Sequence, residues 1–96
     1  MALFVVQHQH SPESCPAGDT MMAPMLLSQL SEQNAQRFGV IIQSEAVIDG
    51  GHTLYLTVEA PDRKSVEQFM QPFAQIGSVE VWPASHCEVV VERGAC

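Results

Sequence analysis

Apolar residues along the chain recur with two different periods, and these periods separate predicted strands from predicted helices. The segment HTLYLTVEA (52–60) alternates, with Leu54, Leu56 and Val58 on one side and mostly polar residues on the other. A period of two is typical of a half-buried strand. Short runs rich in β-branched or aromatic residues predict the other strands, at about residues 2–8, 40–48, 78–84 and 87–92.

The helical period occurs in two segments. Asp19 or Thr20 can cap a first helix that ends near Phe38. Asp62 can cap a second helix, in which Pro72 predicts a break or an irregular last turn. The apolar residues of this second helix recur at i, i+3, i+4 and i+7, which forms one stripe: Val66, Phe69, Met70 and Phe73.

The predicted order is β-α-β-β-α-β with an extra C-terminal strand, in a single domain over residues 1–96. This order is typical of a ferredoxin-like α+β fold, with two helices on one face of an antiparallel sheet. We expect the first and third strands to be neighbours that run in the same direction. The other face of the sheet would carry Tyr55, Thr57 and Trp82, and a second copy of the chain would cover it.

Three segments give the chain a family resemblance: LFVVQH, GGHTLYLTVEA and IGSVEVWPA. They resemble small proteins of the dimeric α/β-barrel superfamily, whose members include monooxygenases, haem-handling proteins and domains without known activity. The resemblance implies a homodimer whose sheets enclose a cavity, and it transfers no catalytic residue. Residues on the inner face would then contact a small ligand: Tyr55, Thr57, Glu80 and Trp82.

Charge and hydropathy narrow the possible partners. The 96 residues carry a net charge of −7, and the four Lys and Arg residues form no basic cluster. Nucleic acid and anionic membrane surfaces both require clustered positive charge, so we expect neither as a partner. The N-terminus lacks the features of a signal peptide, and no apolar run approaches the roughly 20 residues that span a bilayer. We therefore expect a cytoplasmic protein.

Four residues predict a metal site at the end of the first strand. His8 and His10 are two residues apart and therefore share a face of that strand. Parallel first and third strands would bring Glu59 beside them on the barrel side, and Cys15 is close enough to fold back. Two imidazoles with a thiolate suit Zn²⁺ or Cu²⁺, whereas two imidazoles with a carboxylate suit non-haem Fe²⁺.

Other interpretations of the same residues stay open. The two histidines can equally be solvated or hydrogen-bonded at a strand end, which would leave a non-catalytic ligand-binding or assembly module without metal. Cys15 assisted by His10 is a third possibility, as a nucleophile. Other potential ligands have simpler predicted roles: core packing for Met21, Met22 and Met25, turn stabilisation at the far end of the sheet for His52, and a surface connector for His86 and Cys87.

Overall fold

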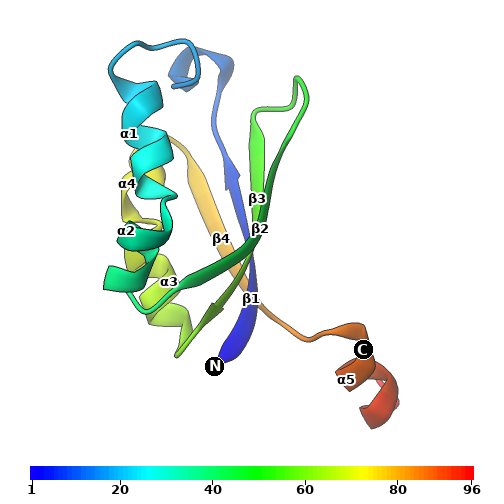
Figure 1. Cartoon of the computed structure of the whole chain (residues 1–96). Coiled ribbons are helices and arrows are strands. Elements are labelled where there is room, and N and C mark those ends of the chain that lie inside the picture. The colour runs from blue at the N-terminus through cyan, green and yellow to red at the C-terminus, as the bar shows by residue number, and fades with distance from the viewer.

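Four strands form one antiparallel sheet in the order β2-β3-β1-β4, with helices α1 to α4 on one side of it (Figure 1). The computed structural model describes all residues, 1–96. The strands are β1 (Ala2–Gln9), β2 (Ile41–Ile48), β3 (Thr53–Ala60) and β4 (Ser78–Ala84). The helices are η1 (Pro12–Ser14), α1 (Met22–Gln29), α2 (Glu32–Arg37), α3 (Arg63–Phe69), α4 (Gln71–Ala74) and α5 (Cys87–Arg93).

The predicted α+β class and the four antiparallel strands are confirmed, but the predicted direction of the third strand is wrong. β1 and β3 are neighbours that run antiparallel, with Gln9 opposite Thr53 and Leu3 opposite Glu59. The reason is topological. Helices α1 and α2 return the chain, so that β2 runs in the direction of β1, and the tight β2–β3 turn then reverses it. The carboxyl end of β1 therefore meets the amino end of β3.

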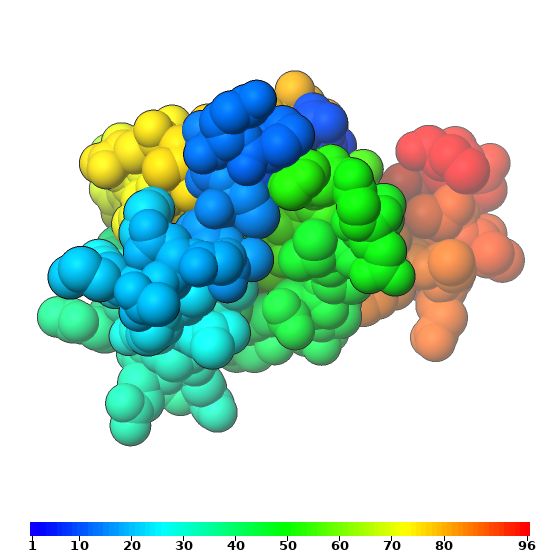
Figure 2. Space-filling model, turned by 90° about the horizontal axis from the view of Figure 1, so that it is seen from above, coloured from blue at the N-terminus to red at the C-terminus, as the bar shows by residue number.

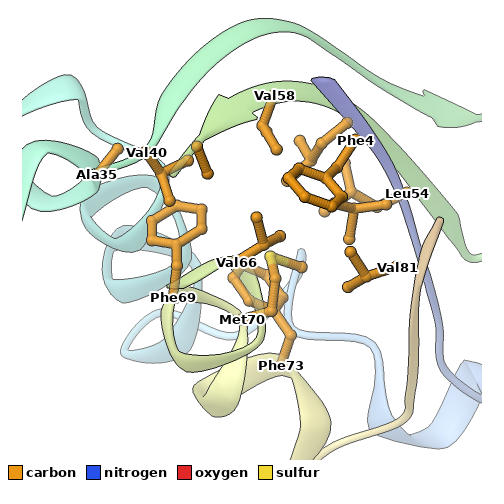
Figure 3. Packing of buried hydrophobic residues seen from close by; sticks show 13 residues of the cluster. Phe4, Ala35, Val40, Leu54, Val58, Val66, Phe69, Met70, Phe73 and Val81 are labelled. Atoms are coloured by element: carbon orange, nitrogen blue, oxygen red, sulfur yellow. The ribbon is translucent and has the colours of Figure 1, made fainter. Parts of the chain in front are cut away.

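The hydrophobic core lies between the sheet and the helices (Figure 3). Alternate residues of β3 face it, as the period of two predicted, and α3 and α4 supply the opposite wall. Phe69 and Met70 are fully buried, and Asp62 caps α3 by accepting a hydrogen bond from the amide of Ser65 at 2.8 Å. Pro72 follows the break between α3 and α4, at the predicted place. This core fixes the helical layer against the sheet.

The first helical segment contains two helices and not the single predicted one. Ser31 has an extended backbone, and its hydroxyl accepts a hydrogen bond from the amide of Asn34 at 3.2 Å. A serine in this conformation begins a new helix, so the chain breaks between α1 and α2. No residue of α1 is buried. Leu26 in the helix and Leu30 just after it are only partly buried against the core. The loose contact of α1 leaves room between this helix and the sheet.

The predicted fifth strand at 87–92 is wrong, because these residues form helix α5. Pro83 lacks an amide hydrogen on the edge strand β4, which disfavours further pairing along that edge. Gly94 ends the helix in the left-handed conformation with φ of 74°, a common helix stop. Helix α5 has no buried residue and projects from the end of β4, away from the helical layer (Figure 1). No helix of the structure is long and apolar enough to cross a membrane.

Candidate metal centre

Three segments converge at the end of the sheet where β1 finishes. They are the end of β1, the η1 segment that follows it, and the β2–β3 turn. Seen from above, the chain after β1 (blue) lies beside the β2–β3 turn (green) and near α4 (yellow), whereas α5 (orange to red) lies apart (Figure 2). The antiparallel register brings these segments together, since the end of β1 pairs with the start of β3.

His10 and His52 are neighbours across this end of the sheet. The amide of His10 donates a hydrogen bond to the carbonyl oxygen of His52 at 3.1 Å, which continues the β1–β3 ladder by one step. The two imidazole centroids are 5.3 Å apart, in an edge-to-face arrangement. His52 has a positive φ of 51°, an uncommon conformation for a residue other than glycine, as it leaves the turn. The predicted placement of His52 at the far end of the sheet is therefore wrong.

Cys15 reaches the two histidines because the η1 segment turns the chain back. The hydroxyl of Ser11 accepts a hydrogen bond from the amide of Ser14 at 3.3 Å, which caps the turn. The amide of Cys15 donates to the carbonyl oxygen of Pro12 at 3.3 Å and closes it. The Cys15 thiol is free and half-buried. Two local hydrogen bonds thus set its position over the strand end.

The potential ligand atoms of His10, Cys15 and His52 all lie within 4.8 Å of one another. In a tetrahedral zinc site, with Zn–N near 2.0–2.1 Å and Zn–S near 2.3 Å, neighbouring ligand atoms are roughly 3.5 Å apart. Binding an ion would draw the three side chains closer together. The structure therefore brings together one thiol and two imidazoles that could hold a metal ion.

His8 lies behind His10 and fixes the protonation of its ring. A carbonyl oxygen only accepts, so the Nδ1 of His8 donates to the carbonyl oxygen of Ser78, at 3.0 Å. The Nε2 of neutral His8 is then an acceptor, and the Nδ1 of His10 donates to it at 3.3 Å. This leaves the Nε2 of His10 with a lone pair and no hydrogen, and that buried atom has no hydrogen-bond partner.

Burial favours the neutral form of both rings, which is the form that this hydrogen-bond chain requires. Desolvation lowers the pKa of His8, against the opposing effect of the Ser78 carbonyl, and repulsion from a protonated His10 would lower this pKa further. Desolvation also lowers the pKa of His10, with a smaller contribution from His52. His8 is only 2% exposed, and its ring packs edge-on against Phe73 with centroids 5.2 Å apart. A neutral imidazole is the form that ligates metals.

A cavity of about 350 Å³ opens beside the three ligand residues. It occupies the space between α1, the sheet and the β2–β3 turn, where α1 packs loosely. Its wall is mainly apolar, and the carboxylates of Glu45 and Asp49 lie among its lining residues. The apolar part is formed by Leu26, Leu27, Leu30, Val47, Ile48, Leu54 and Phe73, among others. The site is therefore a polar cluster at one end of an apolar hollow.

The other predicted site residues lie elsewhere. Glu59 lies opposite Leu3, at the far end of the sheet from His10, and accepts a hydrogen bond from Gln43. His8 faces the helical layer and not the barrel side, since it belongs to the buried face of β1. The predicted ligand-contacting residues alternate with core residues and so lie on the open face of the sheet, outside this cavity: Tyr55, Thr57, Glu80 and Trp82.

Comparison of the chain with protein-family models, with curated proteins and with solved structures finds no match. The resemblance to the dimeric α/β-barrel superfamily therefore stays a prediction. The function of the site is therefore inferred from its geometry alone.

His52 was not predicted to lie beside His10, although the order of helices and strands along the chain indicates the direction of β3. A helix between two strands of one sheet makes them run in the same direction, and a tight turn then reverses the next strand. Applied to this chain, that rule makes β3 antiparallel to β1, and the observed register then places the residue after Gln9 opposite the residue before Thr53. Those two residues are His10 and His52.

Proposed function

We propose that this protein binds a transition metal ion, in the first instance Zn²⁺, through His10 Nε2, Cys15 Sγ and a ring nitrogen of His52. The observation that carries the proposal is the buried Nε2 of His10, which has a lone pair and no partner. An unpaired buried polar atom is costly, and native proteins seldom leave one without a reason. Here it lies beside a thiol and a second imidazole, which are the other two ligands of such an ion.

The ligand types favour Zn²⁺ or copper over iron. Thiolate and imidazole donors select borderline and soft metals, whereas the iron interpretation required a carboxylate. Glu59, the carboxylate of that interpretation, lies at the far end of the sheet. Methionine sulfurs would favour copper, but Met22 and Met25 line a neighbouring pocket with Pro72 and not this cavity. Zn²⁺ is therefore the first ion to test.

The surroundings support a cation and leave one coordination position open. The carboxylates of Glu45 and Asp49 beside the cavity and the net charge of −7 both attract cations. Three protein ligands with an open fourth position distinguish the catalytic zinc sites of proteins from the closed structural ones. A metal-dependent reaction is thus compatible with this ligand set, and so is a binding role without turnover.

Metal analysis of the untagged protein tests the proposal. After equilibration with Zn²⁺ and removal of free metal, we expect one zinc ion per chain. Cys15→Ser and His10→Ala should each lower the zinc affinity by more than the roughly 10–100-fold loss typical of an outer-shell substitution. The matched controls are Cys87→Ser and His86→Ala in the exposed C-terminal segment. Wild-type protein that retains no zinc, or equal losses in the control variants, would contradict the proposal.

We also propose that the fold is a ferredoxin-like one and that two copies cover each other's open sheet face. The strand order and the position of the helices agree with this fold, and large apolar side chains of the open face stay accessible in the single chain. Tyr55 is 39% exposed and Trp82 is 41% exposed. Stacking two sheets would remove them from water. Sedimentation equilibrium should give the mass of a dimer, and a monomer at every concentration would refute this assembly.

A further inference from the structure

We infer that the fourth coordination position takes a small monoanionic ligand with one donor atom and a short apolar tail, such as an alkanethiolate. The inference rests on the proposed metal site and names the class of molecule that the cavity beside it would hold. Two features carry it: the charge that remains on the loaded site and the composition of the cavity wall.

The charge of the loaded site favours an anionic fourth ligand. Zn²⁺ bound by the Cys15 thiolate and by the lone pairs of two neutral imidazoles has a net charge of +1. A net charge beside an apolar wall is costly unless it is paired. A monoanionic donor neutralises the centre, and a sulfur donor also matches the preference of a metal that already has one thiolate.

The cavity wall selects an apolar tail. Beyond the three ligands, the hollow of about 350 Å³ is lined mainly by aliphatic side chains, and its volume lies in the usual range for small-molecule pockets. Leu54 lies on β3 and Val47 lies opposite it on β2, while α1 contributes the facing leucines. Glu45 and Asp49 line the same cavity, and both are exposed residues.

A chain-length series on Co²⁺-substituted protein tests the inference. The thiolate-to-cobalt absorption first reports whether the metal is bound, and its change then reports the binding of an added thiol. From 1-propanethiol to 1-hexanethiol we expect the affinity to rise about fourfold for each added methylene group. 2-Mercaptoethanol, which has as many heavy atoms as 1-propanethiol, should bind more weakly because its hydroxyl meets an apolar wall. Metal-free protein should bind none of these thiols measurably.

A cavity variant gives an independent check. Val47 is 58% exposed, so Val47→Phe should fold, narrow the cavity and weaken hexanethiol binding at least several-fold without changing cobalt affinity. Val89→Phe on α5, outside the cavity, is the matched control. Bound cobalt with no dependence on chain length would overturn this inference and leave the metal site intact. Failure to bind cobalt or zinc would contradict the proposed function itself. The chain-length series uses wild-type protein, so it does not depend on the folding of any variant.

Discussion

At the scale of single residues, the feature that most defines the site is the hydrogen-bond chain from Ser78 through His8 to His10. Each link follows from the one before, because the carbonyl oxygen of Ser78 accepts and thereby fixes the donor and acceptor nitrogens of both rings. Metal-ligating histidines commonly donate their second ring N–H to such a partner, which orients the ring and raises its basicity. His8 is therefore a positioning residue for His10.

Replacing His8 should weaken metal binding without removing a ligand. His8→Leu places an apolar side chain in this buried position and removes the acceptor for the Nδ1–H of His10. We expect zinc affinity to fall about 10–100-fold, as for other outer-shell partners. His8→Gln, whose amide oxygen can accept that hydrogen, should recover part of the loss.

The measurement for this prediction is a competition titration with a chromophoric zinc chelator, with circular dichroism to confirm that each variant is folded. His86→Leu, an exposed histidine outside the site, serves as the control. If folded His8→Leu protein binds zinc as tightly as the wild type, His8 has no positioning role.

At the scale of elements, the site depends on how closely β4 approaches the end of β1. Gly77 precedes β4, and a Cβ added there would lie 3.0 Å from the Cα of His10 and would overlap the carbonyl oxygen of Gln9. Both of these contacts are with backbone atoms, which cannot rotate away as a side chain can. The close approach also places the Ser78 carbonyl beside His8. The glycine is thus required by packing at the site.

Gly77→Ala should therefore affect stability and metal binding together. Overpacking of this kind typically lowers the free energy of unfolding by about 1–3 kcal/mol, and the shifted backbone should also lower zinc affinity. Gly18→Ala is the matched control, because a Cβ at Gly18 meets no atom within 4 Å. Urea unfolding of metal-free protein measures the first effect and zinc competition the second. Equal unfolding midpoints for the two variants would show that no close approach exists.

The cap of α3 gives a pH-dependent prediction. The hydrogen bond from the Ser65 amide, followed by that from the Ser65 hydroxyl, lowers the pKa of the Asp62 carboxyl below its usual value. Because the folded-state pKa is depressed, the stabilisation is present above the unfolded pKa of about 3.9 and is lost as the pH falls through the folded value. The destabilisation caused by Asp62→Ala should thus be largest near neutral pH and shrink in acid.

Thermal unfolding across this pH range measures the effect, with Glu92→Ala on the exposed helix α5 as the control. A destabilisation by Asp62→Ala that stays constant from neutral pH to below the usual pKa would show that the charged carboxylate does not form the cap.

The elements themselves were largely predictable from the sequence, whereas their contacts at the site were only partly so. Period-two alternation in 52–60 and the apolar stripe of α3 and α4 specify local structure, and both are confirmed. The segment CEVVVE was wrongly predicted to be a strand, because its β-branched residues favour a strand only where they can pair with a neighbouring strand. The sequence predicted that Cys15 lies near His10, because the two residues are close along the chain, and the structure places them together. Which residue of the third strand region lies near His10 depends on the direction of that strand. The wrong direction predicted Glu59, whereas the observed direction brings His52 there.

At the scale of the whole molecule, the chain is longer than a compact domain of its size. The Cα radius of gyration is 14.2 Å and the longest extent is 47 Å, whereas a compact domain of this length has a radius of about 12.5 Å. Helix α5 accounts for part of this length, and Val91 on it is 78% exposed. An open sheet face and a projecting helix with an exposed valine both favour the proposed second copy.

The proposed dimer predicts a specific effect of charge on the open face. Trp82→Glu should shift the protein toward the monomer, because it would place a carboxylate in the proposed interface between two sheets. Lys64→Glu on α3, in the helical layer, should leave the mass unchanged. Sedimentation equilibrium measures both, and a Trp82→Glu variant with the same association constant as the wild type would exclude the open face as the interface.

The most direct test of the metal centre is X-ray absorption spectroscopy at the zinc edge on the zinc-loaded, untagged protein. The proposed ligands predict a single sulfur neighbour at about 2.3 Å and two imidazole nitrogens at about 2.0–2.1 Å, with the sulfur signal lost in Cys15→Ser. A first shell without sulfur, or one with several sulfurs from cysteines of different chains, would contradict the His10–Cys15–His52 centre.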